Sequence, residues 1–251
     1  MDHGLWTMDL GEMFMKYIVI VPVVAFFVFA QVWGLFFAPA DQLMGFVQKL
    51  MYVHVPAAWT SFIAFFVVFI SSLLYLLRKK IFWDHLASAG AEVGVVFTAL
   101  TLSLGSIWGR PTWGVWWTWD ARLTTTAILL FLYAGYIIFR AFIEDRDQRA
   151  KLSSPLGILI FLNVPIVYLS VKWWRTLHQV QSNPSTMDPQ MALSLRLNAF
   201  AFLFVLILFI YYRFRLNQLK EKIEEKQSLP PKGKDHRPWT MDHGPSVGGA
   251  I

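Results

Sequence analysis

The sequence predicts an all-α integral membrane protein, a bundle of six transmembrane helices with both termini in the cytoplasm. Apolar residues make up 56% of the 251 residues and charged residues only 15%, which lies far outside the average of soluble domains. Six apolar runs each reach roughly 20 residues, enough to cross about 30 Å of hydrocarbon as a helix. The predicted spans are residues 17–37, 55–77, 86–107, 123–143, 155–174 and 192–212.

These runs are continuous rather than alternating, which excludes a β-barrel, and an open sheet would leave backbone groups unpaired in lipid. The first run resembles a signal peptide, since Ala38-Pro39-Ala40 offers a small-x-small site. Its apolar core is too long for one, and about 16 residues including Lys16 precede it. We therefore predict an uncleaved first span.

The second span begins within the segment "MYVHVPAAW". Pro56 suits the first turn of a helix and restricts Val55 to an extended shape. His54 is therefore expected at the outer membrane surface. In the third span, Glu92 lies among small residues that favour close packing, so it faces the bundle interior. It either bonds another helix or lines a pathway, and Asn163, beside Pro165, and Asn198 carry the same ambiguity.

After the sixth span, "RFRLNQLKEKIEEK" carries Leu216, Leu219 and Ile223 on one stripe, which is typical of an amphipathic helix on a membrane surface. Residues 1–226 are thus expected to form one transmembrane domain with this C-terminal helix. Residues 227–251 are rich in Pro, Gly and charge, which predicts a disordered cytoplasmic tail.

Basic residues determine the predicted orientation. Of the 22 Lys and Arg residues, 16 fall on the side that holds the termini, and this bias predicts that the termini are cytoplasmic. The net charge of +6 therefore reflects topology and lipid contact, not binding to nucleic acid. Cysteine is absent, which excludes disulfides, thiolate metal sites and cofactor attachment through C-x-x-C-H.

The outer loop "WGRPTWGVWWTWDARLT", residues 108–124, is the main functional signal. Nine of the 12 tryptophans lie in or next to outer loops, whereas an interfacial belt would be similar at both surfaces. Gly109 and Pro111 favour a turn, and Gly114 leaves room for a flat ligand. If the segment after Thr112 is helical, one face forms an aromatic shelf. Its members are Trp113, Trp116, Trp117 and Asp120.

Polar residues of this loop have two interpretations each. Asp120 directly precedes the fourth span and either caps that helix or belongs to the ligand site. Arg110 and Arg122 either extend to lipid headgroups or hold a carboxylate with two parallel hydrogen bonds.

Two histidines, His54 and His178 in "KWWRTLHQ", lie at the same predicted depth on different segments. Two neutral imidazoles can bind one iron from opposite faces, which leaves no position open for oxygen. The pattern thus predicts a site that holds haem without using it in catalysis. Four nearby cations are candidates for the two propionates: Lys49, Lys172, Arg175 and Arg196.

With these motifs the sequence resembles the haem-handling proteins that share a tryptophan-rich WWD loop, in particular the branch called cytochrome c maturation protein C. The resemblance runs from the first span through the sixth. It implies that His54 and His178 are the axial ligands of non-covalent haem b and that the loop holds the porphyrin. The loop positions are Trp108, Trp113, Trp116, Trp117, Trp119, Asp120 and Arg122, and Lys49 resembles a basic position near the haem.

The resemblance also implies a function at the periplasmic face of the bacterial inner membrane. The protein would present haem to a periplasmic haem chaperone, whose own histidine bonds covalently to a vinyl group. It would not be an enzyme itself. A small single-span accessory subunit would assist it, and ATP-binding cassette subunits would supply ATP hydrolysis.

Two alternatives stay open at this stage. One is a b-type cytochrome exchanging electrons with quinol; a two-haem version would need buried histidines at both depths of the bundle, whereas both candidates lie outside. A transporter would move haem across the membrane. The few polar residues within the spans argue against a wet pore but leave a route along the lipid side open.

Overall fold

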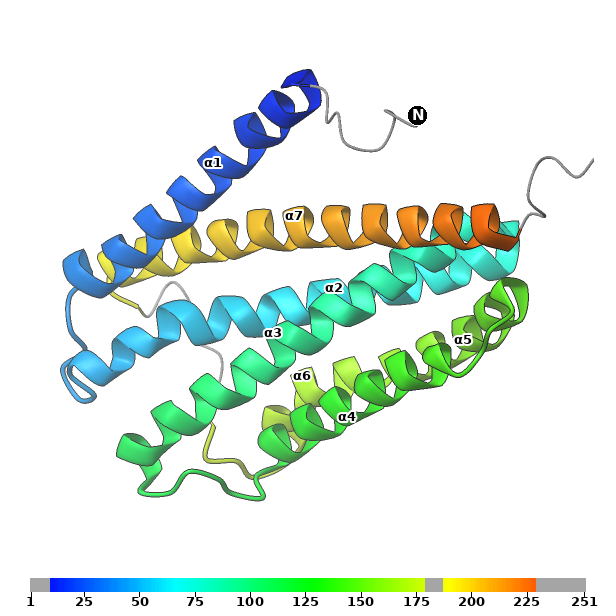
Figure 1. Ribbon diagram of the computed structural model, residues 1–251. Helices are drawn as coiled ribbons and strands as arrows, with labels where there is room; N and C mark the ends of the chain where they lie inside the picture. Colours follow the sequence, from blue (N-terminus) through cyan, green and yellow to red (C-terminus); the bar gives the residue numbers. More distant parts are fainter. Residues whose placement is uncertain (1–9, 179–186, 229–251) are drawn as a thin grey trace, which may run out of the picture.

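The computed structural model describes residues 10–178 and 187–228, and the regular secondary structure in this part of the chain is helical (Figure 1). Six helical segments are long and apolar enough to cross a membrane, which confirms the predicted all-α bundle of six spans. The elements are α1 (Leu10–Val32), η1 (Trp33–Phe37), η2 (Phe46–Leu50), α2 (Met51–Arg78), α3 (Ile81–Trp113), α4 (Ala121–Ala141), α5 (Arg146–Phe161), α6 (Asn163–Trp173) and α7 (Pro189–Ser228).

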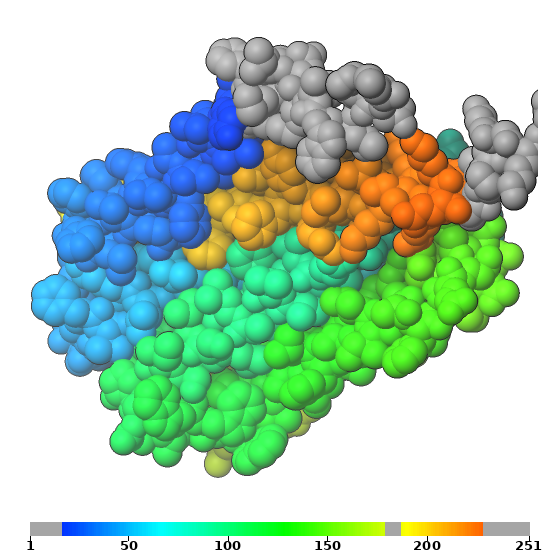
Figure 2. All heavy atoms as spheres, in the orientation of Figure 1, coloured from blue at the N-terminus to red at the C-terminus, as the bar shows by residue number. Residues whose placement is uncertain are grey.

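Helices α2 and α3 form the central pair and pack along their length. On the face seen in Figure 2, α3 lies between α7 on one side and α4 on the other, and α1 packs on the outer side of α7. The buried core between α2 and α4 includes Phe65, whose ring stacks on Tyr133 at a centroid distance of 3.8 Å. Helix α5 packs against α2 beside this core.

The start of the second span differs from the prediction. Helix α2 begins at Met51, directly after the 3-10 turn η2, so Val55 is helical and not extended. Pro56 lies inside the helix, where its ring removes only the backbone hydrogen bond to the Tyr52 carbonyl. His54 consequently projects from the side of a helix and not from a loop.

The segment after the sixth span is helical, as predicted, and it is continuous with that span, because α7 runs without a break to Ser228. No Gly or Pro follows Pro189 within this helix to end it. Side-chain pairs hold its second half on the bundle: Arg213 with Glu92 of α3, and Glu221 with both His85 of α3 and Arg146 of α5. Residues 229–251, the rest of the predicted tail, lie outside the described residues.

Polar residues inside the spans make structural contacts between helices. Glu92 pairs with Arg213. Asn198 of α7 accepts a hydrogen bond from Gln31 of α1 at 2.6 Å and donates to the Ala30 carbonyl at 3.0 Å. These pairings favour the structural interpretation of Glu92 and Asn198 over a pathway.

A buried ion pair locks the end of the bundle opposite to His54. Arg140 of α4 donates two hydrogen bonds to the carboxylate of Asp84 of α3, at 2.6 and 2.8 Å, and one to Ser153 of α5 at 2.6 Å. Both charged side chains are almost fully buried. One guanidinium therefore ties three helices together.

Replacing Arg140 with alanine should destabilise the protein by about 3–5 kcal/mol, because it leaves Asp84 buried without its counter-charge. Arg146→Ala is the matched control, since the side chain of Arg146 is half exposed and exposed pairs contribute roughly 0–1 kcal/mol. Thermal unfolding of the detergent-purified variants, followed by circular dichroism, measures the difference. Equal losses in both variants would contradict the anchoring role of Arg140.

Candidate functional site

The fifth span is broken, and the break opens a cavity. Helix α5 packs against α2, but after Leu162 the chain continues as α6, which packs against α4 instead. Asn163 fixes this displaced half by donating to the Thr125 carbonyl of α4 at 3.0 Å. The resulting pocket, of about 920 Å³, is lined by residues of α2, α3, α4, α6 and α7. This volume lies near the upper end of the roughly 300–1,000 Å³ typical of ligand sites.

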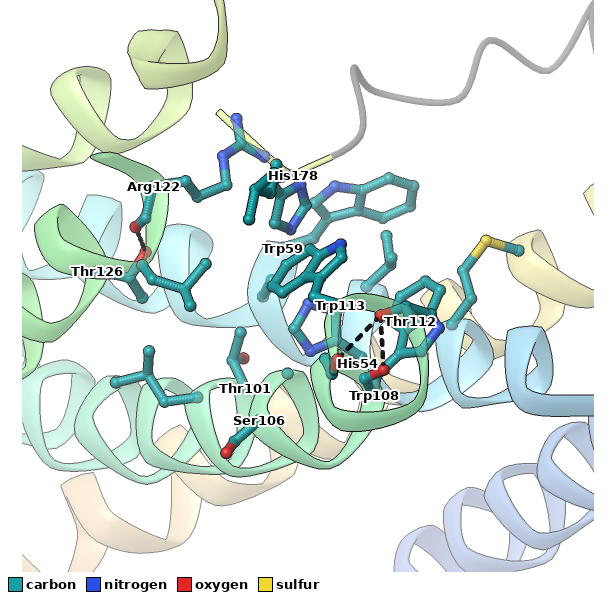
Figure 3. A pocket seen from close by; sticks show the side chains of 18 of the residues that line it. His54, Trp59, Thr101, Ser106, Trp108, Thr112, Trp113, Arg122, Thr126 and His178 are labelled. Carbon is teal, nitrogen blue, oxygen red and sulfur yellow. Dashed lines mark hydrogen bonds between the residues drawn. The ribbon is translucent and has the colours of Figure 1, made fainter. Parts of the chain in front are cut away.

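His54 and His178 meet in this pocket. His54 lies in the first turns of α2 and is buried, and His178 comes from the segment after α6. Their ring centroids are 6.4 Å apart with an angle of 34° between the rings. Figure 3 shows both side chains directed into the same space. The predicted pair is thus brought together from segments far apart in the sequence.

The environment of the His54 ring is tight on one side. A Cβ at Gly105 of α3 would lie 3.0 Å from its Cε1 atom, so the glycine allows α3 to approach the imidazole closely. The Nδ1 atom is buried, and within the described residues it makes no hydrogen bond of good geometry. Since buried polar atoms normally have a hydrogen-bond partner, this unpartnered nitrogen makes His54 a candidate for a functional role.

Two tryptophans of the predicted loop frame the imidazoles. Trp108 meets His54 edge to face at a centroid distance of 5.7 Å, and Trp113 lies 6.4 Å from His178. Both belong to the last turns of α3, because the helix continues through Gly109 and Pro111. The turn predicted at those two residues is therefore wrong, and the chain turns at Gly114 instead, where φ is 78°.

The aromatic shelf predicted after Thr112 does not form, because residues 114–120 are not helical. Ser106 of α3 donates to the Trp116 carbonyl at 2.7 Å, and Arg110 of α3 donates to the Gly114 carbonyl. These two side chains of α3 therefore hold the loop through its backbone carbonyls. Trp117 lines the pocket. Trp116 and Trp119 do not line it, and Trp119 is 84% exposed.

Asp120 joins the loop to the segment that carries His178. Its carboxylate caps α4 by accepting from the Arg122 amide at 2.9 Å, which confirms the predicted cap, and it also accepts from the Leu177 amide at 2.8 Å. Burial raises the pKa of Asp120, but hydrogen bonds from the Thr176 hydroxyl and from the amides of Leu177, Arg122 and Leu123 outweigh it, so the pKa is lowered. The carboxylate is therefore charged at neutral pH.

Among the described residues, the pocket wall contains two cations and no acidic side chain. Arg122 of α4 donates to the Tyr168 carbonyl at 2.9 Å, and Arg196 of α7 donates to the Ala192 carbonyl at 3.2 Å. Lys49, by contrast, is buried outside the wall, where its amino group donates to the Leu35 carbonyl at 2.7 Å. Lys172 and Arg175 are also absent from the wall.

The sequence did not predict some of the residues that line the pocket. Trp59 counted only as one of the outer tryptophans, and Phe62, Thr101 and Tyr168 carried no signal of their own. The spacing of His54, Ala58 and Phe62 along one helical face would have identified the α2 side of the wall once His54 was chosen.

Protein donors for a metal are few here. In the described part of the chain, no cluster of three or more His, Cys, Asp or Glu residues could hold a metal ion. The two imidazoles are the donors that the pocket offers. Such a pair suits a metal whose remaining positions are filled by a ligand brought with it.

Comparisons with known proteins agree on one family. A family model described as CcmC, Heme exporter protein C, matches residues 3–229. A protein of Escherichia coli (strain K12) named Heme exporter protein C is 39% identical over 166 residues, which cover 66% of this chain and 68% of the relative. One of the same name from Haemophilus influenzae is 42% identical over 165 residues, or 65% and 67%. A putative cytochrome c biosynthesis ccmC-like mitochondrial protein of Marchantia polymorpha is 42% identical over 145 residues, or 58% and 61%.

Replacing Asp120 with alanine should release both the start of α4 and the His178 segment. Loss of the cap alone costs about 0.5–2 kcal/mol, and the Leu177 amide loses its acceptor as well. Hydrogen exchange read by mass spectrometry should therefore speed up in residues 121–124 and 174–178. Because the pKa of Asp120 is lowered, the wild-type contacts persist at neutral pH and are lost only in acid, below that pKa.

Asp145→Ala is the control, because Asp145 caps α5 through the Gln148 amide and contacts no part of the His178 segment. The control should change exchange only at the start of α5. If exchange in residues 174–178 stays at the wild-type rate in Asp120→Ala, the carboxylate does not hold this segment.

Proposed function

The chain belongs to the CcmC family, Heme exporter protein C, and on this premise we propose that it holds haem b non-covalently between His54 and His178 and presents it to a periplasmic haem chaperone during cytochrome c maturation. The observation that carries the proposal is the meeting of the two imidazoles in one large pocket. Family membership alone supports the coarser statement, a multi-pass membrane protein of haem export and cytochrome c biogenesis.

The distance between the rings fits one metal between them. Metal–imidazole bonds are about 2.0–2.1 Å long and a ring nitrogen lies about 1.1 Å from its centroid, so imidazoles on opposite faces of one metal have centroids about 6.3 Å apart. The observed separation is 6.4 Å. Both ring planes would contain the axis through the metal, and a twist about that axis accommodates the 34° between them.

The buried nitrogen of His54 supports the same assignment. Nδ1 lies on the side of α3, near the Thr101 carbonyl. Nε2 is then the atom left to bind iron, and a small rotation of the ring would let Nδ1 donate to that carbonyl. Metal-binding histidines usually donate their second nitrogen to such an acceptor, which fixes the orientation of the ring.

The two arginines of the wall match a ligand with two carboxylates. Arg122 and Arg196 lie in different helices around the pocket, and guanidinium forks suit carboxylates well. No described residue of the wall is acidic, so none of these side chains competes with the ligand for the two arginines. Lys49, which does not line the pocket, is the weaker candidate for this role.

The chemistry expected of this site is binding and presentation, without catalysis by the chain itself. Bound haem would supply a reactive vinyl group, and the attacking histidine would belong to the chaperone. His54, His178 and the indoles of Trp108 and Trp113 would fix the ring, which lowers the entropic cost of the encounter. Trp116 and Trp119, exposed beside the pocket, are available to contact that chaperone.

The remaining partners and the location follow from the family. A small single-span subunit and ATP-binding cassette subunits would complete the complex, and lipid would surround the spans. The excess of Lys and Arg on the side of the termini supports an orientation in which the pocket faces the periplasm across the inner membrane.

Replacing His54 or His178 with alanine should abolish the low-spin bis-histidine absorption spectrum of the haem-loaded protein, because one axial position is then lost. His85→Ala is the matched control, since His85 pairs with Glu221 at the opposite end of the bundle. Its spectrum should equal that of the wild type. An unchanged low-spin spectrum in both His54→Ala and His178→Ala would overturn the proposed ligation.

Replacing Arg196 with alanine should weaken binding of haem by roughly 10- to 100-fold, the effect of losing a charged hydrogen bond of about 1.5–3 kcal/mol. The dimethyl ester of haem carries no propionate charge, so its affinity should change little. Titration of both ligands by absorbance gives the ratio of affinities. Lys172→Ala, an exposed cation outside the wall, serves as the control and should affect neither ligand.

A further inference from the structure

The pocket extends well below the two histidines. Along α2 the lining residues Met51, His54, Ala58 and Phe62 recur at helical spacing. At about 1.5 Å per residue, the stretch from Met51 to Phe62 spans about 16 Å, roughly half of the hydrocarbon thickness of about 30 Å. The wall therefore reaches a depth at which lipid, and not water, surrounds the bundle.

At this depth α2 and α6 do not close against each other. Helix α6 packs on α4, whereas α5 is the part of the fifth span that packs on α2. The two aromatic residues that line the pocket on facing helices, Trp59 of α2 and Tyr168 of α6, are 43% and 44% exposed. Residues that line a cavity and are also exposed form the rim of an opening.

Trp59 lies on the outer surface of the bundle. It also lines a second, small cavity of about 140 Å³ along the seam of α2 and α7, together with Ile63 and Phe200. Ile63 and Phe200 are apolar and exposed at the depth of the spans, as lipid-facing residues are. A residue shared by this cavity and the main pocket marks the boundary between the pocket and the bilayer.

The wall near this rim is uncharged. Ala58 and Phe62 of α2 and Val167 of α6 form it, while Arg122 lies in the first turn of α4, at the end of the bundle. An apolar ring can cross such a rim without desolvating a charged group. Carboxylates on the same ligand would stay at the level of Arg122.

We propose that the pocket opens sideways into the bilayer between α2 and α6, and that haem enters from the membrane leaflet at the His54 end, passing between Trp59 and Tyr168. The proposal rests on the proposed haem-binding function. It assigns the break after Leu162 a further role, since the displacement of α6 creates the entrance as well as the pocket.

The chain contains no cysteine, so a reversible barrier can be built across the rim. Trp59→Cys and Tyr168→Cys, joined by a bifunctional maleimide with a cleavable disulfide spacer, would bridge the opening in protein reconstituted into lipid nanodiscs. Haem is delivered dissolved in the nanodisc lipid, and the rate at which the bis-histidine spectrum appears is measured. The control pair, Ile63→Cys with Phe200→Cys, bridges the neighbouring seam outside the main pocket.

The link across the rim should slow loading by about tenfold or more, as expected when binding must wait for an obstructed path. Cleavage of the spacer should restore the rate, and the control link should leave it unchanged. Unchanged loading across the linked rim, or equal slowing by the control link, would overturn the lateral entrance. Failure of the unlinked protein to give any bis-histidine spectrum would instead refute the proposed function itself.

Discussion

The displacement of α6 from α2 is the constraint on which the site depends. A continuous fifth span would pack along α2 for its whole length, as α5 does, and would fill the space that the pocket occupies. The break after Leu162 ends that contact halfway. Asn163 and Arg122, through the Thr125 and Tyr168 carbonyls, then attach the displaced half to α4. Two polar side chains thus stabilise a cavity that apolar packing alone would close.

The two ends of the bundle are stabilised in different ways. At the end opposite to His54, Arg140, Asp84 and Ser153 join three helices through buried hydrogen bonds. At the His54 end, hydrogen bonds from side chains to backbone groups predominate, and Asp120 is the only carboxylate in the described residues that bridges the loop and the His178 segment. A rigid distant end allows the other end to remain open, since the helices are already fixed in register.

The polar side chains of the pocket are suited to binding a ligand and not to catalysis. Its titratable nitrogen groups are two imidazoles and two guanidiniums, and the described lining residues include hydroxyl groups but neither a carboxylate nor a cysteine. Both imidazoles in one metal site would leave no open position for chemistry. Aromatic and aliphatic side chains form most of the remaining surface, as expected for a site that binds a flat apolar ring.

The sequence by itself determined the features that depend on local composition. Six spans followed from the length and apolarity of the runs, and the cap at Asp120 followed from its position before the fourth run. His54 and His178 stood out because no other histidines lay in the outer segments. These inferences hold because hydrophobic length and helix capping act within one segment of the chain.

Only the tertiary structure decided which of these residues share a pocket. Trp113 and Trp116 are three residues apart and would share one face of a helix, yet Trp113 lines the wall and Trp116 does not, because residues 114–120 are not helical. Arg196 lines the wall and Lys49 does not, since the amino group of Lys49 donates a hydrogen bond to the Leu35 carbonyl. Asn163 was recognisable as a costly polar residue, but its acceptor belongs to another helix. Whether α6 packs on α2 or on α4 depends on contacts between segments far apart in the sequence, and no local sequence pattern predicts it.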